Sequence, residues 1–193
     1  MSFEVRFWGV RGSIACASSQ YTVYGGNTSC VEVRVDDRVI ILDAGTGIRE
    51  LGKKIMADNI SNATLMFTHT HWDHINGFPF FVPAYIPTHS FKVLAGHLKD
   101  RRGSIRHTLS SQMVGPMFPI PLEAMQADLQ FEDFSAGETF KLYPDVTVRT
   151  SALNHPNEAT GYRIEHNGRS VCYITDTEHK QDKPDEKILR LID

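Results

Sequence analysis

Apolar and polar residues alternate along several short segments in the first half of the chain, which is the pattern of strands with one buried face. The segments at residues 3–8 and 30–35 alternate most clearly. Residues 39–42 and 63–67 are unbroken apolar runs, typical of strands that are buried on both faces. Between these two runs, apolar residues recur at helical spacing over residues 48–56, which predicts an amphipathic helix.

The second half of the chain begins with a weaker pattern and then returns to strands. Residues 104–114 have helical spacing, and the three prolines that follow them predict an irregular loop. The strands predicted after this loop are residues 139–142, 146–148, 161–164 and 170–174. Asn167-Gly168 predicts a hairpin between the last two strands, and a final helix begins at Asp185. Strands with interspersed helices indicate a layered α/β fold.

The composition fits one globular domain over residues 1–193. Hydrophobic residues make up 41% and charged residues 22%, which excludes wholesale disorder and a fibrous repeat. The net charge of −3 argues against a general nucleic-acid coat, which would be basic. Three cysteines without a CxxC pair suit a reducing cytoplasm. The alternating start is unlike an export signal and no apolar stretch is long enough to span a bilayer, so we expect a cytoplasmic protein without membrane contact.

Four potential metal ligands stand directly after the apolar run at residues 63–67: His69, His71, Asp73 and His74. On an extended chain, His69 and His71 point to the same side. Asp73 and His74 fall in the following turn, where a bend can direct them to a second position. Imidazole nitrogens and carboxylate oxygens are ligands that zinc and other first-row metals accept. The cluster therefore predicts a metal site rather than a solvated polar loop.

This cluster, together with Asp43 after an earlier strand, resembles the metallo-β-lactamase superfamily, and the resemblance covers essentially the whole chain. It implies an α/β fold of the four-layer αββα sandwich type. The segments at residues 8–13, 25–30 and 76–81 are similar to a bacterial branch of cytoplasmic metallohydrolases. That branch includes cyclic-phosphodiesterase-like proteins and is related to tRNA 3′-processing ribonucleases.

The resemblance also implies two divalent metal ions, zinc in the first place, with manganese or iron as alternatives. The implied ligands are His69, His71 and His155 at metal one, and Asp73, His74 and the bridging Asp176 at metal two. Asp43 would orient the ligand loop, the other interpretation of this residue being a helix N-cap. Asp73 and Asp43 are thus the candidate catalytic carboxylates.

The position of Asp176 carries cysteine in the antibiotic-hydrolysing zinc enzymes of this superfamily, so β-lactam hydrolysis is not expected. The branch resemblance favours a small phosphodiester such as a cyclic nucleotide, attacked by a hydroxide held between the metals. Nucleic acid is a less favoured partner because no strong basic stripe is evident, and a homodimer is left open. The predicted donors to the substrate are Ser13, Asn27, Thr28 and Ser29. A basic cluster that either steers a phosphate or forms a solvated face comprises Lys99, Arg101, Arg102 and Arg106.

Four alternatives to a small-molecule phosphodiesterase remain open. The same pair of sites would serve an ester, thioester or lactone hydrolase, or a ribonuclease of the tRNA-processing type. A single-iron dioxygenase of this superfamily uses only the first site, and a degenerate site would leave an inactive binding scaffold. The number and identity of the bound metals separate the hydrolases from the last two classes.

Family members normally continue past the motif of Asp176 to a fifth-motif histidine, which completes metal two. Only His179 follows Asp176 here, and it is too close in sequence for that role. We therefore expect a C-terminally incomplete version of the family architecture, with metal two held more weakly than metal one. The histidines outside the motifs are interpreted as surface or turn residues: His89, His97, His107 and His166.

Overall fold

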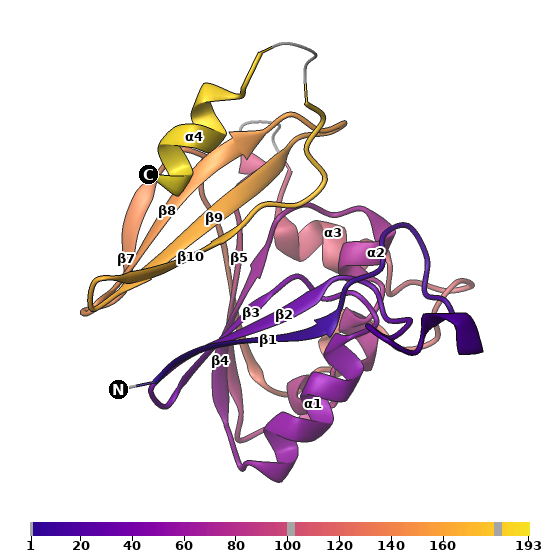
Figure 1. The fold of residues 1–193 in the computed structure, drawn as a ribbon. Helices are drawn as coiled ribbons and strands as arrows, with labels where there is room; N and C mark the ends of the chain where they lie inside the picture. The colour runs from indigo at the N-terminus through magenta and orange to yellow at the C-terminus, as the bar shows by residue number, and fades with distance from the viewer. Residues whose placement is uncertain (1, 100–102, 180–182) are drawn as a thin grey trace.

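The computed structural model describes residues 2–99, 103–179 and 183–193, and its larger sheet has six strands in the order β1-β2-β3-β4-β5-β6 (Figure 1). These strands are β1 (Phe3–Gly9), β2 (Cys30–Val35), β3 (Arg38–Leu42), β4 (Asn62–Phe67), β5 (Ser90–Ala95) and β6 (Asp128–Asp133). The pairs β1–β2 and β2–β3 are antiparallel, whereas β3 to β6 are parallel. The parallel ladder places the carboxyl ends of β3 and β4 at the same edge of the sheet.

The smaller sheet is antiparallel throughout and has the order β10-β9-β8-β7. Its strands are β7 (Thr139–Tyr143), β8 (Val146–Leu153), β9 (Ala159–His166) and β10 (Arg169–Tyr173). The hairpin expected at Asn167-Gly168 joins β9 to β10, and both of its residues have positive φ, as a tight hairpin turn requires.

Two hydrophobic clusters divide the molecule into layers. One lies between the two sheets and includes Val33, Ile40 and Val148; the other lies between the larger sheet and its helices and includes Leu65 and Ile105. The helices are α1 (Ile48–Ala57), α2 (Trp72–Ile75), α3 (Ile105–Ser111) and α4 (Glu186–Ile192). Figure 1 shows α1, α2 and α3 on the outer side of the larger sheet and α4 on the outer side of the smaller one. The predicted αββα arrangement is confirmed.

Helix α1 illustrates how the sequence pattern becomes a layer. Ile48, Leu51 and Ile55 recur at helical spacing, and all three side chains are fully buried against the larger sheet. The opposite face of the helix carries Lys53, whose ammonium group bonds to Glu50 at 2.8 Å in solvent. The predicted helix over residues 48–56 is therefore confirmed.

Two strands were not predicted. β6 alternates exposed and half-buried positions at the edge of the sheet, and its acidic sequence is typical of a loop. In β5, Lys92 interrupts the apolar pattern, and its charge is matched across the ladder by Glu132 at 2.7 Å. Both strands depend on pairing partners that are distant in sequence, which a local pattern does not reveal.

No helix among the described residues is long and apolar enough to cross a membrane. Four strands, β3, β4, β8 and β10, end at one edge of the sandwich, and this edge positions the site. Asp43 directly follows β3, and His69 stands two residues after β4. From the smaller sheet, His155 stands two residues after β8 and Asp176 three residues after β10.

Candidate metal centre

Three imidazole rings converge at the edge where the strands end. His69 Nε2 lies 3.1 Å from His71 Nδ1, and His155 Nε2 lies 3.0 Å from the same His71 atom. The ring nitrogens of these three residues all lie within 4.8 Å of one another. The structure thus brings together His69 and His71 with His155, which is 84 positions from His71 in the chain.

A second donor group adjoins the first and shares His69 with it. It consists of His69, His74 and Asp176, whose ligand atoms also lie within 4.8 Å of one another. Asp176 Oδ2 is 2.8 Å from His74 Nε2 and 3.5 Å from His69 Nε2. One carboxylate oxygen therefore lies between the two groups, as a residue bridging two metals would require.

Asp43 is the hub that orients these ligands from behind. Its side chain is buried, and its Oδ2 accepts a 2.8 Å hydrogen bond from His74 Nδ1. The hydroxyl of Thr68 donates to the same carboxylate and lies 3.1 Å from His69 Nδ1, from which it can accept. Both imidazoles are thus held by Nδ1, which leaves each Nε2 directed at the site. Tyr173 OH donates a further bond to Asp43 Oδ2 at 3.1 Å from the smaller sheet.

Asp73 lies beside the second donor group. Its Oδ2 is 3.5 Å from His74 Nε2 and accepts a 2.7 Å hydrogen bond from the backbone N–H of Ser13. The structure therefore places Asp73 next to His74, with one carboxylate oxygen fixed by the loop that carries Ser13. Its role as a ligand of metal two stays a prediction.

Two of the site carboxylates sit on strained backbone. Asp43 has φ of 61° and Asp176 has φ of 41°, in the left-handed region that residues with a Cβ seldom adopt. Aspartate tolerates this region better than most residues because its side chain bonds locally. Such strain is concentrated at functional sites, where the surrounding structure holds it in place.

The two central histidines differ in electrostatics. Burial, reinforced by the neighbouring His74, His71 and His155, lowers the pKa of His69 to about 2, so this ring is neutral. Burial also disfavours charge on His74, but the carboxylates of Asp43, Asp73 and Asp176 outweigh it and raise the pKa of His74 to about 9. The ring of His69 is therefore neutral as a metal ligand must be, whereas His74 would have to release a proton to bind a metal.

The donor chemistry fits divalent metals of the zinc type. Tetrahedral zinc with Zn–N bonds of 2.0–2.1 Å separates neighbouring ligand nitrogens by about 3.3 Å. The observed separations of 3.0 and 3.1 Å around His71 Nδ1 are close to that value. Neutral imidazoles with an adjoining carboxylate suit zinc, and they suit manganese or iron as well.

The residues predicted to contact the substrate form hydrogen bonds within the protein. The side chain of Thr28 is fully buried, and its hydroxyl accepts a bond from the backbone N–H of Thr46 at 2.8 Å. Asn27 accepts a bond from the Thr46 hydroxyl at 3.1 Å, and the carbonyl of Ser29 accepts one from the N–H of Gly45. Contacts of Ser13, Asn27, Thr28 and Ser29 with a substrate stay predictions.

Close backbone packing holds this loop region against α2. A Cβ on Gly45 would stand 2.2 Å from the carbonyl oxygen of Asp73, and one on Gly77 would stand 2.1 Å from the carbonyl oxygen of Gly45. Both contacts are too short for any side chain, so these glycines allow the loop after β3 to touch the turn that carries the ligands.

Several residues that support the ligands were not identified from sequence. Thr68 and Tyr173 bond to Asp43, and burial together with Asp43 keeps the pKa of Tyr173 well above its usual value, so that it remains a donor. His97 is only 4% exposed, and its Nε2 lies 3.2 Å from the hydroxyl of Thr70, between two ligands. His97 stands in a bend after β5, but its side chain is buried, so its interpretation as a surface residue is wrong. Position directly after an apolar strand was the available signal for Thr68.

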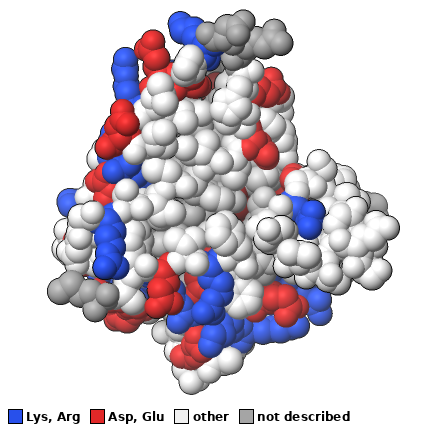
Figure 2. Space-filling model, viewed as in Figure 1, with Lys and Arg blue, Asp and Glu red and all other residues white. Residues whose placement is uncertain are grey.

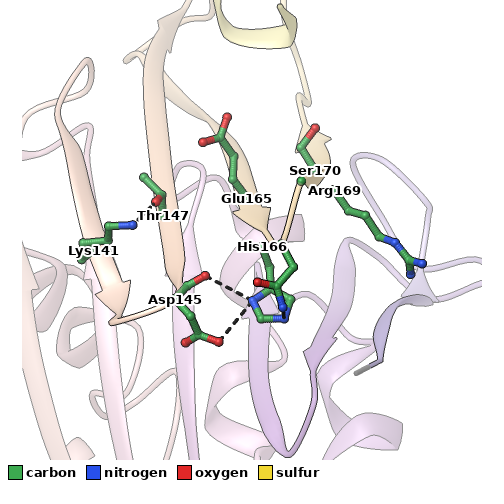
Figure 3. Close-up of a pocket in the computed structure, with 9 residues that line it drawn as sticks. Lys141, Asp145, Thr147, Glu165, His166, Arg169 and Ser170 are labelled. Carbon is green, nitrogen blue, oxygen red and sulfur yellow. Dashed lines mark hydrogen bonds and ion pairs between the residues drawn. The ribbon is translucent and has the colours of Figure 1, made fainter.

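His166 was also misplaced by the sequence interpretation, because it is 4% exposed. Figure 3 shows it in a pocket of about 370 Å³ at the turns that join β7 to β8 and β9 to β10. We call Asp36, Asp145 and His166 the distal group, since their ligand atoms also lie within 4.8 Å of one another. Arg38 binds both carboxylate oxygens of Asp145, at 2.5 and 2.7 Å, so a cation of the protein already occupies this group.

The basic cluster proposed to steer a phosphate is described only in part. Lys99 lies 3.9 Å from Glu138, and Arg106 lies 3.5 Å from Glu123. Arg101 and Arg102 lie outside the described residues. The two described members are therefore paired with acidic side chains on the surface, as a solvated face would be.

Sequence comparison gives a family match and no individual relative. Residues 38–192 match the model of the β-lactamase superfamily domain. This segment includes both donor groups and Asp43. A comparison with curated protein sequences gives no match.

Solved structures show the same fold at low sequence identity. The metallo-β-lactamase fold protein YhfI from Bacillus subtilis is 14% identical, with a TM-score of 0.64 over 92% of this chain and 63% of that one. Zinc-bound PqqB from Methylobacterium extorquens is 18% identical, with a TM-score of 0.59 over 88% of this chain and 61% of that one. The short form of human tRNase Z is 16% identical, with a TM-score of 0.62 over 97% of this chain and 73% of that one. The chain thus spans less than two thirds of the first two proteins.

Proposed function

The chain belongs to the β-lactamase superfamily domain family, and from that premise we propose that it is a dinuclear metal-dependent hydrolase that cleaves a small phosphodiester. A cyclic nucleotide is the preferred substrate class. The observation that carries the proposal is the shared position of Asp176 Oδ2, within 3.5 Å of His69 Nε2 and 2.8 Å of His74 Nε2. Two donor groups joined in this way suit two adjacent metal ions.

The residues of the chain have separate tasks in this proposal. His69, His71 and His155 hold metal one, and His74, Asp73 and Asp176 hold metal two. Two bound divalent ions activate water and neutralise charge on phosphoryl oxygens. Asp43 fixes the tautomer of His74 and, through Thr68, that of His69, so that both Nε2 lone pairs are available. The backbone N–H of Ser13 fixes Asp73.

Three observations support the substrate class. Aspartate at position 176 gives an oxygen-rich second site, which suits hard phosphoryl chemistry better than cysteine would. The structural neighbour tRNase Z is a ribonuclease by name, hence an enzyme of phosphodiester bonds. Figure 2 shows acidic and basic side chains interspersed on the face drawn, without a continuous basic stripe, which favours a small substrate over a nucleic acid.

Zinc is the proposed metal, because neutral imidazoles dominate the first group and the neighbour PqqB is zinc-bound. Elemental analysis of the purified protein tests this directly. Two zinc or manganese ions per chain are expected. One iron per chain would overturn the proposal in favour of a dioxygenase, and no metal after repletion would indicate a binding scaffold.

Activity is tested on metal-replete protein with bis-p-nitrophenyl phosphate, cyclic nucleotides and a thioester. We expect turnover of the phosphodiesters, abolished in His71→Ala and retained in the matched variant His107→Ala, whose exposed side chain lies outside both donor groups. Turnover of the thioester without turnover of any phosphodiester would overturn the substrate class. Equal activity of His71→Ala after chelation and metal addition would overturn the assignment of the site.

A further inference from the structure

A separate cavity of about 590 Å³ is lined in part from the segments that follow Asp43 and α2, which also carry residues of the candidate metal centre. We call it the α1–α2 cavity, because Arg49 lines it from the first turn of α1 and Asn76 from the residue that ends α2. Ala15 and Asn27 line it from the segment between β1 and β2, and Phe80 closes one wall. Its volume is in the range of small-molecule sites, roughly 300–1,000 Å³.

The α1–α2 cavity adjoins the metal centre through two connections. Asp73 and Asn76 are three residues apart on the turn of α2, a spacing that places their Cβ atoms about 5–6 Å apart on one face. Ser13, which bonds to Asp73 Oδ2, is two residues from Ala15 of the cavity lining. The cavity lining and Asp73 therefore share the turn of α2 and the segment that carries Ser13.

Two amide side chains of the cavity lining have their oxygens occupied by hydrogen bonds. Asn27 Oδ1 accepts from the Thr46 hydroxyl at 3.1 Å, and Asn76 Oδ1 accepts from the Thr28 hydroxyl at 3.4 Å. These bonds occupy the amide oxygens, and neither Nδ2 donates to another described residue. The amide N–H groups are therefore available to a ligand that presents acceptors.

Arg49 and Phe80 add a cation and an aromatic surface. The Arg49 guanidinium lies 3.9 Å from Glu50, which also lines the cavity and is itself bound by Lys53 at 2.8 Å. The ring of Phe80 is 54% exposed and packs edge-on against Phe118, with centroids 5.6 Å apart. Thr46, Glu50 and Gly77 complete the lining. A flat ring that stacks on Phe80 and presents acceptor atoms toward Arg49 matches this arrangement.

We propose that the α1–α2 cavity binds the purine or pyrimidine base of a nucleotide substrate whose phosphodiester lies at the metal centre. The inference rests on the proposed function and narrows it to base-bearing phosphodiesters. The base stacks on Phe80, and its ring nitrogens and carbonyl oxygens accept bonds from Asn27, Asn76 and Arg49. Phosphodiesters without a base use only the metal centre.

Binding to the chelated protein tests the cavity without any need for turnover. The probes are adenosine 5′-monophosphate and uridine 5′-monophosphate, and ribose 5-phosphate is the matched ligand that lacks a base. Binding is monitored by NMR of the side-chain amide signals. We expect saturable shifts of the Asn27 and Asn76 side-chain amide signals with at least one of the two nucleotides and none with ribose 5-phosphate. Equal binding of ribose 5-phosphate, or binding of neither nucleotide, would overturn the proposal.

Two variants test the location. Ala15→Phe fills the cavity, whereas Ala17→Phe, at an exposed position of the same segment that does not line the cavity, is its control. Phe80→Ala removes the stacking surface, with the half-exposed Val82→Ala as its control. We expect the nucleotide Kd to rise about tenfold or more in each test variant, the effect of losing one base–aromatic stack. Equal Kd values in test and control variants would overturn the location.

The two proposals can fail independently. Nucleotide binding that depends on Ala15 and Phe80, in a protein that cleaves no phosphodiester, would support the cavity and refute the hydrolase. Phosphodiester cleavage with nucleotide binding that ignores both residues would support the hydrolase and refute the cavity.

Discussion

The metal centre and the distal group are two clusters of similar donors at opposite ends of the smaller sheet. β8 connects them, from Val146 beside the distal group to Leu153 near His155, and eight strand residues span about 25 Å. Each cluster contains histidine and aspartate within 4.8 Å. They differ in the hydrogen-bond and ion-pair partners of those histidine and aspartate side chains.

In the distal group, the protein supplies every partner. His166 Nδ1 lies 3.2 Å from the carbonyl of Asp145, and its Nε2 lies 2.9 Å from the amide nitrogen of Asn167. Arg38 neutralises Asp145 and holds the pKa of that carboxyl at about 2. In the metal centre, no described lysine or arginine pairs with the carboxylates, and three imidazole nitrogens face one another. Proximity of donors alone therefore does not distinguish the two clusters, whereas pairing with a lysine or arginine among the described residues does.

The largest expected effect is on zinc affinity, which should depend on a histidine of the metal centre and not on the histidine of the distal group. His155→Ala removes a proposed ligand nitrogen, so we expect the zinc affinity of this variant to fall by more than about 100-fold. Loss of a residue that only hydrogen-bonds to a ligand lowers metal affinity by about 10–100-fold. His166→Gln is expected to bind zinc as the wild type does. Competition with a chromophoric chelator measures both. Equal losses of zinc affinity in the two variants would show that the metal centre and the distal group do not differ in metal binding.

The next effect concerns pH in the chelated protein. His74 has a folded pKa of about 9 against an ordinary value of 6.5, so the protonated ring stabilises the fold. This stabilisation, of order 3 kcal/mol, is fully present below pH 6.5 and is lost as the pH rises through about 9. Urea unfolding of chelated protein between pH 6 and 10 measures it.

His74→Gln is the control for this prediction, because it lacks the titrating ring. Its unfolding free energy should change less over the same pH range than that of the wild type. A wild-type protein as stable at pH 10 as at pH 6 would show that the carboxylates around His74 do not act as described.

A smaller effect is expected when the hub behind the ligands is altered. Asp43→Asn keeps a residue that tolerates positive φ but removes the charge that holds His74 and Thr68. We expect zinc affinity to fall about 10–100-fold, the range for supporting partners. Chelator competition measures the loss, and Asp36→Asn in the distal group is the matched control. An unaffected Asp43→Asn would mean that the ligands hold their orientation without the hub.

The smallest effect concerns the distal cation. Arg38→Gln breaks a bidentate but partly exposed pair, so we expect a slight fall in the urea midpoint and no change in metal content. A double-mutant cycle with Asp145→Asn isolates the pair. If Arg38→Gln binds metal at the distal group, the Arg38 guanidinium is what keeps metal from this group in the wild type.

The sequence allowed the ligand turn to be predicted because its information is local. His69, His71 and His74 are close in the chain and follow an apolar run, so spacing alone brings them together. His155 and Asp176 required the family resemblance, because a single histidine between two strands or a single aspartate at a strand end is weak evidence for a ligand. The αββα layers followed from the same resemblance, and the strand and helix patterns agree with it.

The remaining features depend on contacts between distant segments. His97 and His166 have polar sequence neighbours, yet packing against strands from elsewhere in the chain buries both rings. Tyr173 reaches Asp43 across 130 positions, from one sheet to the other. β6 forms a strand because it pairs with β5 in parallel. No window of the sequence contains these partners.

The gathering of strand ends at one edge also has a consequence for the order of folding. His74 and Asp176 are 102 positions apart, and the hub bond from Tyr173 closes a still longer loop. Contacts of such separation form late, because loop entropy is lost before they can contribute. A metal held by ligands from both sheets would therefore bind most tightly once the two sheets have docked. By mass action it would then add most of its binding free energy to the completed topology.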